Sequence, residues 1–161
     1  MERKEELNKE IQERFQEFYI DFISPFGDDT LIIKKEGIFP VLSFLKNYGF
    51  ELLLDITAVD YLGKKPRFEV VYHLLSFKDR KRIRVKAGVD EDDPKVTTVT
   101  SLWKNADWLE REVWDMYGII FEGHPNLKRI LMYEEFKGHP LRKDYPFRKR
   151  QPRIELLYPE D

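Results

Sequence analysis

Apolar residues recur at helical spacing in two segments near the N-terminus. In residues 2–18 they occupy positions i, i+4, i+8 and i+11, which are Leu7, Ile11, Phe15 and Phe18. Nearly all other positions there are charged or amide side chains, so the pattern predicts an amphipathic helix over 2–18. A second helix is predicted over 39–48, where Gly49 follows the last residue. Its expected inward positions are Phe39, Leu42 and either Leu45 or Phe44.

Runs of apolar and β-branched residues predict strands after each of these helices. The first is short, over 30–34, and follows a turn rich in Pro, Gly and Asp. Three longer segments, 52–61, 67–76 and 82–88, then follow one another with short polar connections. Because short connections join neighbouring antiparallel strands, these three segments are expected to form an antiparallel meander.

A third helix is predicted over 107–117. Asp107 is a suitable N-cap, Glu110 stands three residues later as in a capping box, and Gly118 ends the helix. The apolar stripe expected to face inward consists of Leu109, Val113, Met116 and Tyr117.

The chain changes character after residue 118. Residues 119–161 contain five of the nine prolines and show no further helical period. We therefore predict a folded domain over 1–118 and an extended, proline-rich, basic docking arm over 119–161. The predicted fold class is α+β, with a mixed, largely antiparallel β-sheet of four to six strands backed by helices, and an irregular C-terminal arm.

Composition narrows the chemistry that these 161 residues can support. There is no cysteine, which excludes a disulfide, a thiol nucleophile and any Cys-ligated zinc or iron–sulfur site within the chain. A net charge of −2 argues against a general nucleic-acid-binding surface. No apolar run approaches the roughly 18 residues of a membrane span, and the charged N-terminus does not look like a signal peptide.

The predicted third helix carries a dense group of charges: Glu110, Arg111, Glu112 and Asp115. Glu112 and Asp115 are three residues apart and share a face, which is compatible with a general acid–base pair. No nucleophile or Gly-rich loop accompanies them. A solvated face, or ion pairs to a neighbouring element, is therefore the favoured interpretation.

Two His residues, His124 and His139, each stand between Gly and Pro. The residue before a proline is restricted to extended conformations, so both are expected on turns or extended segments. Two His residues without a suitably spaced acid do not make a zinc site. A structural or interface role is favoured for both.

Residues 137–153 combine seven basic residues with one acid, Asp144. Interleaved basic and aromatic residues are compatible with RNA binding. The alternative, which we favour, is an arm that lies on a partner protein, because an irregular tail cannot bury its own apolar side chains. Those side chains are Leu141, Tyr145, Phe147, Ile154, Leu156, Leu157 and Tyr158.

Two motifs in this region resemble a known family. The run from Glu110 to Gly118, followed by His124, Lys128, Ile130 and Leu131, and then the block Gly138–Pro146, are similar to the 30 kDa subunit, also called the C subunit, of respiratory NADH:quinone oxidoreductase, or complex I. The resemblance is sharp over residues 97–150. The same domain also occurs in complex-I-like membrane-bound hydrogenases.

The resemblance implies a structural subunit of the peripheral arm on the cytoplasmic face of the membrane. Its C-terminal segment would embrace the large quinone-site subunit, which is called the D subunit in bacteria. No catalytic, cofactor-binding or metal-binding residue is expected in this chain, and FMN and iron–sulfur clusters are expected in partner subunits. The residues expected at the partner interface are Glu110, Arg111, Glu112, Asp115, His124, His139, Arg142, Lys143 and Tyr145.

Overall fold

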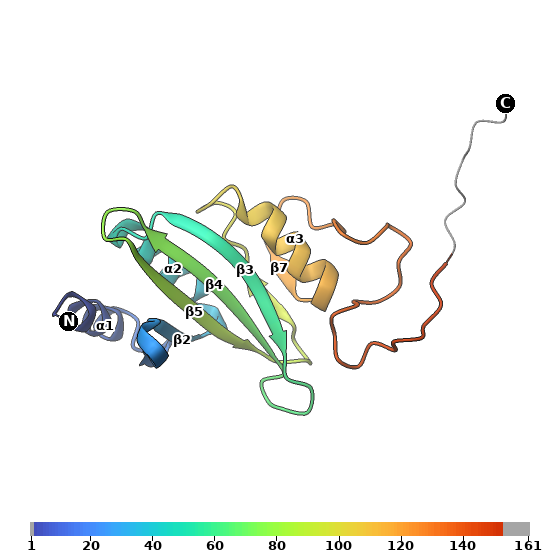
Figure 1. Cartoon of the computed structure of the whole chain (residues 1–161), viewed down its shortest axis with the longest axis horizontal. Coiled ribbons are helices and arrows are strands. Elements are labelled where there is room, and N and C mark those ends of the chain that lie inside the picture. The colour runs from blue at the N-terminus through green and yellow to red at the C-terminus, as the bar shows by residue number, and fades with distance from the viewer. Residues whose placement is uncertain (1, 153–161) are drawn as a thin grey trace.

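The computed structural model describes residues 2–152 and shows an α+β fold (Figure 1). Its helices are α1 (Glu2–Arg14), η1 (Pro25–Gly27), η2 (Lys35–Gly37), α2 (Ile38–Tyr48) and α3 (Ala106–Tyr117). Its strands are β1 (Tyr19–Ile23), β2 (Thr30–Lys34), β3 (Leu52–Asp60), β4 (Phe68–Ser76), β5 (Lys81–Val89), β6 (Lys95–Thr97) and β7 (Ile120–Glu122). Four apolar residues assigned to the arm, Ile154, Leu156, Leu157 and Tyr158, lie outside the described residues.

The main sheet has five strands in the order β1-β2-β5-β4-β3. The strands β3, β4 and β5 form the predicted antiparallel meander. The strand β2 pairs with β5 in parallel, whereas β1 pairs with β2 in antiparallel orientation. A second, two-stranded parallel sheet joins β6 to β7. The predicted fold class is therefore confirmed, and the main sheet is mixed because of the parallel pair β2–β5.

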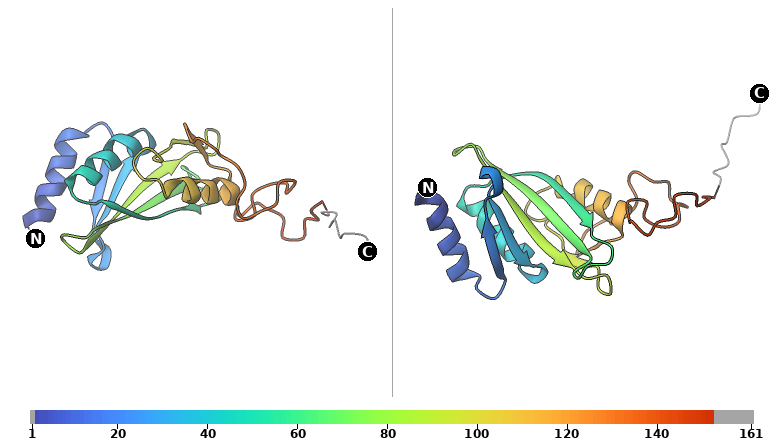
Figure 2. Two further views of the ribbon diagram at one scale, coloured as in Figure 1. Left: turned by 90° about the horizontal axis from the view of Figure 1, so that it is seen from above. Right: turned by 60° about the horizontal axis from the view of Figure 1, so that its bottom comes forward.

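The helices cover the sheet unequally. In Figure 1, α2 lies behind the sheet and α3 lies beside the edge strand β3. Figure 2 shows α1 at the N-terminal end of the molecule, far from the C-terminal arm. One hydrophobic core joins these layers. It includes Leu7 and Ile11 of α1, Leu42 of α2, Tyr72 of β4 and Val113 of α3.

The first two helices differ in detail from the prediction. Helix α1 ends at Arg14, not at residue 18. Phe18 follows the helix and packs against Gly37, where an added Cβ would lie 2.5 Å from the Phe18 Cβ. This contact accounts for an apolar residue at position 18. In α2 the buried stripe is Ile38, Val41, Leu42 and Leu45. The helix begins one residue earlier than predicted, and Phe39 lies off this stripe and is exposed, so its predicted inward position is wrong.

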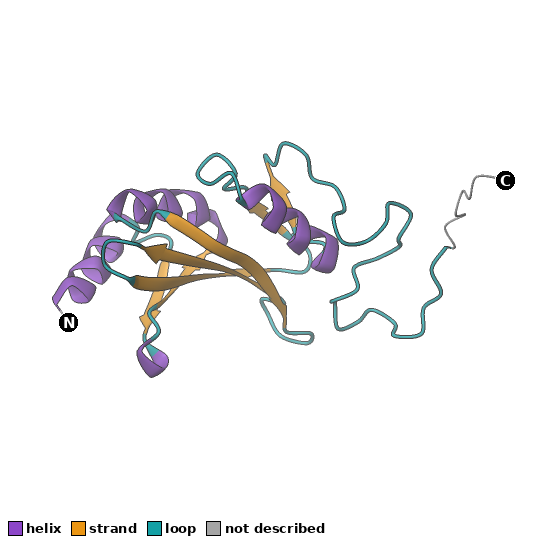
Figure 3. Ribbon diagram, turned by 45° about the horizontal axis from the view of Figure 1, so that its top comes forward, coloured by secondary structure: helices purple, strands orange, loops and turns teal. Residues whose placement is uncertain are grey.

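Three short strands, β1, β6 and β7, were not predicted. Strands β6 and β7 have only three residues each, and β1 buries none of its five residues, so none of the three shows a reliable alternation. Strand β7 lies within the predicted arm, and Ile119 and Phe121 belong to the core of the folded domain. Beyond it, residues 123–152 contain no helix or strand, as the proline content predicted (Figure 3).

Candidate partner interface

The part of the arm that follows β7, residues 123–152, extends away from the sheet, yet it is bonded to the folded domain at two buried carboxylates. One is Asp115 on α3, and the other is Asp60 at the end of β3. We call these two places the Asp115 clamp and the Asp60 clamp. They determine where the arm leaves the domain and which of its side chains remain exposed.

The Asp115 clamp consists of Asp115, Arg129 and the backbone of residues 130–132. Oδ1 of Asp115 accepts a hydrogen bond from Nη1 of Arg129 at 2.6 Å. Oδ2 accepts the backbone N–H groups of Ile130, Leu131 and Met132 at 3.1, 2.9 and 2.8 Å. Burial alone would raise the pKa of Asp115, but these bonds outweigh it and hold the pKa below its usual value.

Arg129 extends this clamp to the rest of the arm. Its Nη2 donates to the carbonyl oxygens of Phe136 and Gly138 at 2.6 and 3.2 Å. Its guanidinium also lies over the rings of Trp114 and Phe136, 5.6 and 5.5 Å from their centroids. One side chain therefore connects α3 to two turns of the arm.

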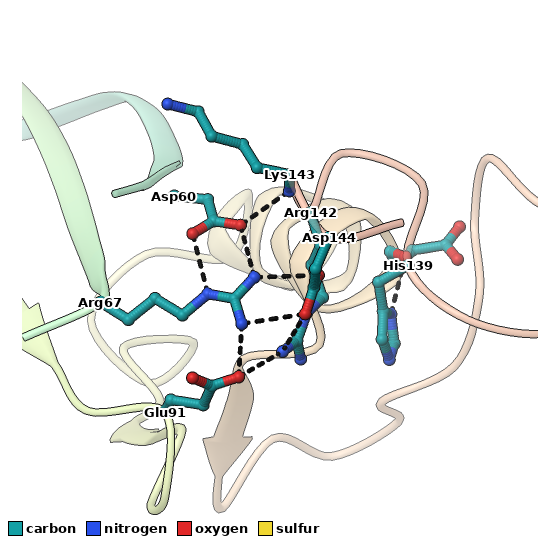
Figure 4. A network of polar contacts seen from close by, with 8 residues as sticks. Asp60, Arg67, Glu91, His139, Arg142, Lys143 and Asp144 are labelled. Atoms are coloured by element: carbon teal, nitrogen blue, oxygen red, sulfur yellow. Dashed lines mark hydrogen bonds and ion pairs between the residues drawn. The ribbon is translucent and has the colours of Figure 1, made fainter. Parts of the chain in front are cut away.

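The Asp60 clamp lies where the β3–β4 hairpin meets the arm (Figure 4). Asp60 and Arg67 form a bidentate pair, with Nε–Oδ1 and Nη2–Oδ2 both at 2.9 Å. Asp60 also accepts the backbone N–H of Lys143 at 2.8 Å. Arg67 reaches the carboxylates of Asp144 at 2.9 Å and of Glu91. The Asp60–Arg67 pair at the centre is buried, since each residue is 3% exposed, whereas Glu91 and Asp144 are half-exposed.

Arg142 completes the Asp60 clamp from the arm side. It binds Glu91 at 3.0 Å and Asp144 at 3.2 Å. The guanidinium groups of Arg142 and Arg67 both lie over the Phe68 ring, at 5.2 and 4.9 Å from its centroid. Three carboxylates therefore face two guanidinium groups around one aromatic ring.

The charges of the Asp60 clamp are stable at ordinary pH. Hydrogen bonds from Arg67 lower the pKa of Asp60, and they lower the pKa of Asp144 to about 2. The same bonds raise the pKa of Arg67. Every one of these three groups is thus held in its charged form, which suits a structural ion-pair network and not a proton-transfer site.

The local chain explains why Arg67 lies inside the molecule. Pro66, which precedes it, packs on Gly88 of β5, where an added Cβ would lie 2.4 Å from the Pro66 ring. Only glycine leaves room there, so the connection between β3 and β4 folds closely against β5. Arg67 directly precedes β4, opposite Asp60, the last residue of β3.

The predicted interface residues on α3 divide into buried and exposed. Glu110, Arg111 and Asp115 are buried within this chain, whereas Glu112 is exposed. Helix α3 begins at Ala106 after Asn105, and no side chain caps it, so the predicted Asp107–Glu110 capping box is wrong. Glu110 is instead fully buried, on the helix face that also carries the buried Ala106 and Val113.

Glu110 supports the segment that precedes α3. It accepts the Thr98 hydroxyl at 2.5 Å and the Val99 N–H at 2.7 Å. Burial raises the pKa of Glu110 to about 7, although these two bonds act in the opposite direction. The hydroxyl of Tyr72, also fully buried, has no hydrogen-bond partner among the described residues.

Arg111 also bonds within the chain. Its Nε and Nη2 donate to the carbonyl oxygens of Lys128 and Arg129 at 3.1 and 3.0 Å. Its guanidinium lies over the ring of Trp108, 5.2 Å from the centroid. Arg111 thus makes two hydrogen bonds with the arm's own backbone. Its contact with a partner protein stays a prediction.

The two His residues hold turns of the arm. In His124, Nδ1 accepts the N–H of Asn126 at 3.0 Å, so the proton lies on Nε2, which donates to the Asp107 carbonyl at 3.2 Å. In His139, Nδ1 donates to the Asp115 carbonyl at 3.0 Å, and burial lowers its pKa. Among residues 2–152 no group of three or more acidic or His side chains has the spacing of a metal site.

The remaining predicted residues lie in the arm. Arg142 belongs to the Asp60 clamp, and Lys143 contributes its backbone N–H while its side chain is exposed. The ring of Tyr145 stacks on Phe136 with a centroid distance of 6.0 Å. Their role at a partner interface is not tested by these contacts and stays a prediction.

Five residues of the clamps were not predicted: Asp60, Arg67, Glu91, Arg129 and Asp144. A sequence signal existed for some of them. Asp60 and Arg67 have opposite charges on the two sides of the β3–β4 connection, and Asp144 is the single acid among seven basic residues. Opposite charges at such positions indicate a pair across the hairpin or between hairpin and arm.

Comparison with known proteins identifies a family for this arrangement. Residues 31–151 match the family described as "Respiratory-chain NADH dehydrogenase, 30 Kd subunit". The C subunit of NADH-quinone oxidoreductase from Citrifermentans bemidjiense is 51% identical over 84% of this chain and 85% of the relative. The combined C/D subunit of the same enzyme from Bdellovibrio bacteriovorus is 43% identical over 94% of this chain, which covers 27% of that longer protein.

Solved structures show the same fold. "Nqo5 of the trypsin-resistant fragment (1-134)" is 36% identical, with a TM-score of 0.66 over 75% of this chain and 98% of the fragment. A chain of an archaeal membrane-bound sulfane sulfur reductase is 29% identical, with a TM-score of 0.74 over 90% of this chain and 86% of that one. The chain therefore belongs to the family of the 30 kDa subunit, or C subunit, of respiratory-chain NADH dehydrogenase.

Proposed function

We propose that this chain is an accessory structural subunit of proton-translocating NADH:quinone oxidoreductase, and that its arm binds the quinone-site protein of that complex, the D subunit. The observation that carries the proposal is the arm itself. Its described part is held by two internal clamps and still exposes Leu131, Leu141 and Phe147, the last of them 100% exposed. Apolar side chains presented on a fixed backbone suit a permanent protein interface.

The clamps lower the cost of such docking. A mobile tail loses conformational entropy when it binds, whereas a segment already held by its own domain loses less. In the Bdellovibrio bacteriovorus relative, the C and D subunits form one polypeptide. This covalent link in a relative supports the D subunit as the partner of the arm.

We also propose that the chain is non-catalytic and that electrons pass through FMN and iron–sulfur clusters held by partner subunits. The absence of cysteine from the sequence supports this for the clusters. The proposed location is peripheral, on the cytoplasmic face of the membrane. Within residues 2–152, no helix is long and apolar enough to cross a membrane.

A second candidate function keeps the structural role but changes the complex. The likeness to a chain of the sulfane sulfur reductase favours it, because a different membrane complex contains the same fold. The candidate is a scaffold protein in a complex-I-like assembly such as a membrane-bound hydrogenase. The NADH:quinone activity of the purified assembly separates this candidate from the first.

The test is purification of the native assembly through a tag on this chain. We expect the D subunit and the flavin and iron–sulfur subunits to co-purify. The double variant Leu141→Asp with Phe147→Asp should lose them, whereas Phe26→Asp, which changes a fully exposed Phe outside the arm, should retain them. Recovery of the unmodified chain as a monomer would contradict the proposal. Full assembly of the arm variant with slow turnover would contradict its non-catalytic role.

A further inference from the structure

The turn between β4 and β5 forms a second surface with interface character. It comprises residues 77–82, Phe-Lys-Asp-Arg-Lys-Arg, which we call the hairpin patch. Figures 1 and 2 show this turn at the opposite end of the meander from the arm. All of its side chains except that of Asp79 are exposed. A contact made here would therefore be separate from one made by the arm.

The four cations of the hairpin patch, Lys78, Arg80, Lys81 and Arg82, form no ion pair or side-chain hydrogen bond with any residue that the structure describes. Further along β5 the cations do have partners. Lys86 binds Glu69 at 2.8 Å, and Arg84 lies 3.9 Å from Asp28. The acid within the patch, Asp79, contacts the Ser76 hydroxyl at 3.3 Å. The unpaired cations are thus concentrated at the turn.

Arg80 has a left-handed backbone conformation, with φ of 51°. Glycine and asparagine adopt this conformation at lower cost than a long side chain does. A non-glycine residue in this region, at an exposed turn, is a reason to look for a function of its side chain. Here the side chain adds a fourth cation to the patch.

Phe77 adds an apolar element. Its side chain is 61% exposed, while its N–H donates to Glu51 at 3.2 Å. An exposed aromatic ring beside unpaired cations matches a partner that offers carboxylates around an apolar contact. Glu51, which accepts the Phe77 N–H, places a carboxylate beside the patch, so a long polyanion such as nucleic acid would meet repulsion there.

We propose that the hairpin patch is a second docking site, which binds an acidic segment of another protein in the assembled complex. This inference rests on the proposed function, because it requires the chain to be part of a complex. With the arm at one end of the meander and the hairpin patch at the other, the chain would connect two subunits and fix their separation.

The first experiment places the photo-reactive residue p-benzoylphenylalanine at position 77 and irradiates the purified complex. We expect a cross-link to a segment of another subunit with net negative charge. The same probe at Phe26, on the β1–β2 turn, is the matched control and should not label that segment. A cross-link to lipid, to nucleic acid or to an uncharged or basic segment overturns the proposal, as does labelling confined to this chain.

The second experiment uses charge reversal. The variant Arg80→Glu with Arg82→Glu should weaken retention of the cross-linked subunit at least tenfold, measured as its dissociation rate from the immobilised complex. Lys34→Glu with Lys104→Glu changes two exposed cations elsewhere and should have no effect. Equal retention in both variants overturns the inference. The D subunit should stay bound in each, so failure here is distinct from failure of the proposed function.

Discussion

The two ends of the β3–β5 meander use the same residue types in opposite ways. At the β3–β4 end, Arg67 and Arg142 are surrounded by carboxylates. At the β4–β5 end, Arg80 and Arg82 have no described partner. The paired cations, Arg67 buried and Arg142 partly buried, hold the chain's own arm, whereas cations left exposed and unpaired are available to another molecule. Net charge alone, at −2, conceals this difference.

The largest expected effect comes from breaking the Asp60 clamp. Arg67→Ala leaves the buried carboxylate of Asp60 without its bidentate partner, and should lower the free energy of unfolding by about 3–5 kcal/mol. Urea unfolding of the isolated chain measures this. Arg84→Ala, which removes a partly exposed cation 3.9 Å from its acid, should cost under about 1 kcal/mol. Similar losses for both variants would show that burial does not determine how much an ion pair contributes to the stability of this chain.

The pH dependence of stability tests Glu110. Its carboxyl titrates near 4.5 when unfolded and its pKa is about 7 when folded, so the folded state favours the protonated form. The free energy of unfolding should therefore fall as pH rises from about 4.5 to about 7, by about 3 kcal/mol. Burial lowers the pKa of His73 and His139, which gives an opposite trend.

The variant Glu110→Gln isolates this contribution, because both His residues remain in it. Urea unfolding at pH 5 and pH 8 should show a stability difference between wild type and variant that changes with pH in the stated direction. A difference that is the same at both pH values would mean that Glu110 is ionised throughout this range.

The Asp115 clamp offers a comparison within one helix. Asp115→Asn removes the charge that faces Arg129 and should cost about 2–3 kcal/mol. Glu112→Gln, three residues earlier and exposed, should change stability by less than about 0.5 kcal/mol. Hydrogen exchange checks the location of the effect, since protection of the amides of residues 130–132 should fall only in the Asp115 variant.

The smallest expected effect has the opposite sign. Arg80→Gly replaces a residue at φ of 51° by one that adopts this conformation readily, and should raise stability by about 0.5–1 kcal/mol. Arg80→Lys keeps the charge and the backbone strain, and should leave stability unchanged. Thermal unfolding measures both. In the complex the order should reverse, with Arg80→Gly weakening the proposed hairpin contact.

Long, regular patterns in the sequence predicted most of the fold. The meander was predicted because β3, β4 and β5 each have nine residues, long enough to show their apolar character. The parallel pairing of β2 with β5 was not, because it joins segments about fifty residues apart and no local pattern encodes it. Strands β6 and β7 were missed because three residues are too few to show alternation, and β1 was missed because none of its five residues is buried.

The candidate site was predicted in part. The motifs around Glu110–Asp115 and Gly138–Asp144 were found in the sequence. That both form hydrogen bonds with other segments of this same chain was not predicted. Glu112 and Asp115 look equivalent in sequence, and only the tertiary packing places one in solvent and the other against the arm. From the sequence, Arg111 likewise looks like a surface cation. The structure shows that it donates hydrogen bonds to the carbonyl oxygens of Lys128 and Arg129.

The three backbone N–H groups on Asp115 have a consequence for how this region tolerates sequence change. Because Asp115 binds the main chain of residues 130–132, most substitutions there leave its hydrogen bonds intact. Proline is the exception, since it has no N–H to donate. An insertion between Arg129 and Met132 would also shift the register, so that Arg129 and the bonded amides could no longer reach Asp115 together. The hydrogen bonds of Asp115 therefore depend on the number of residues between Arg129 and Met132 more than on the side chains at positions 130–132.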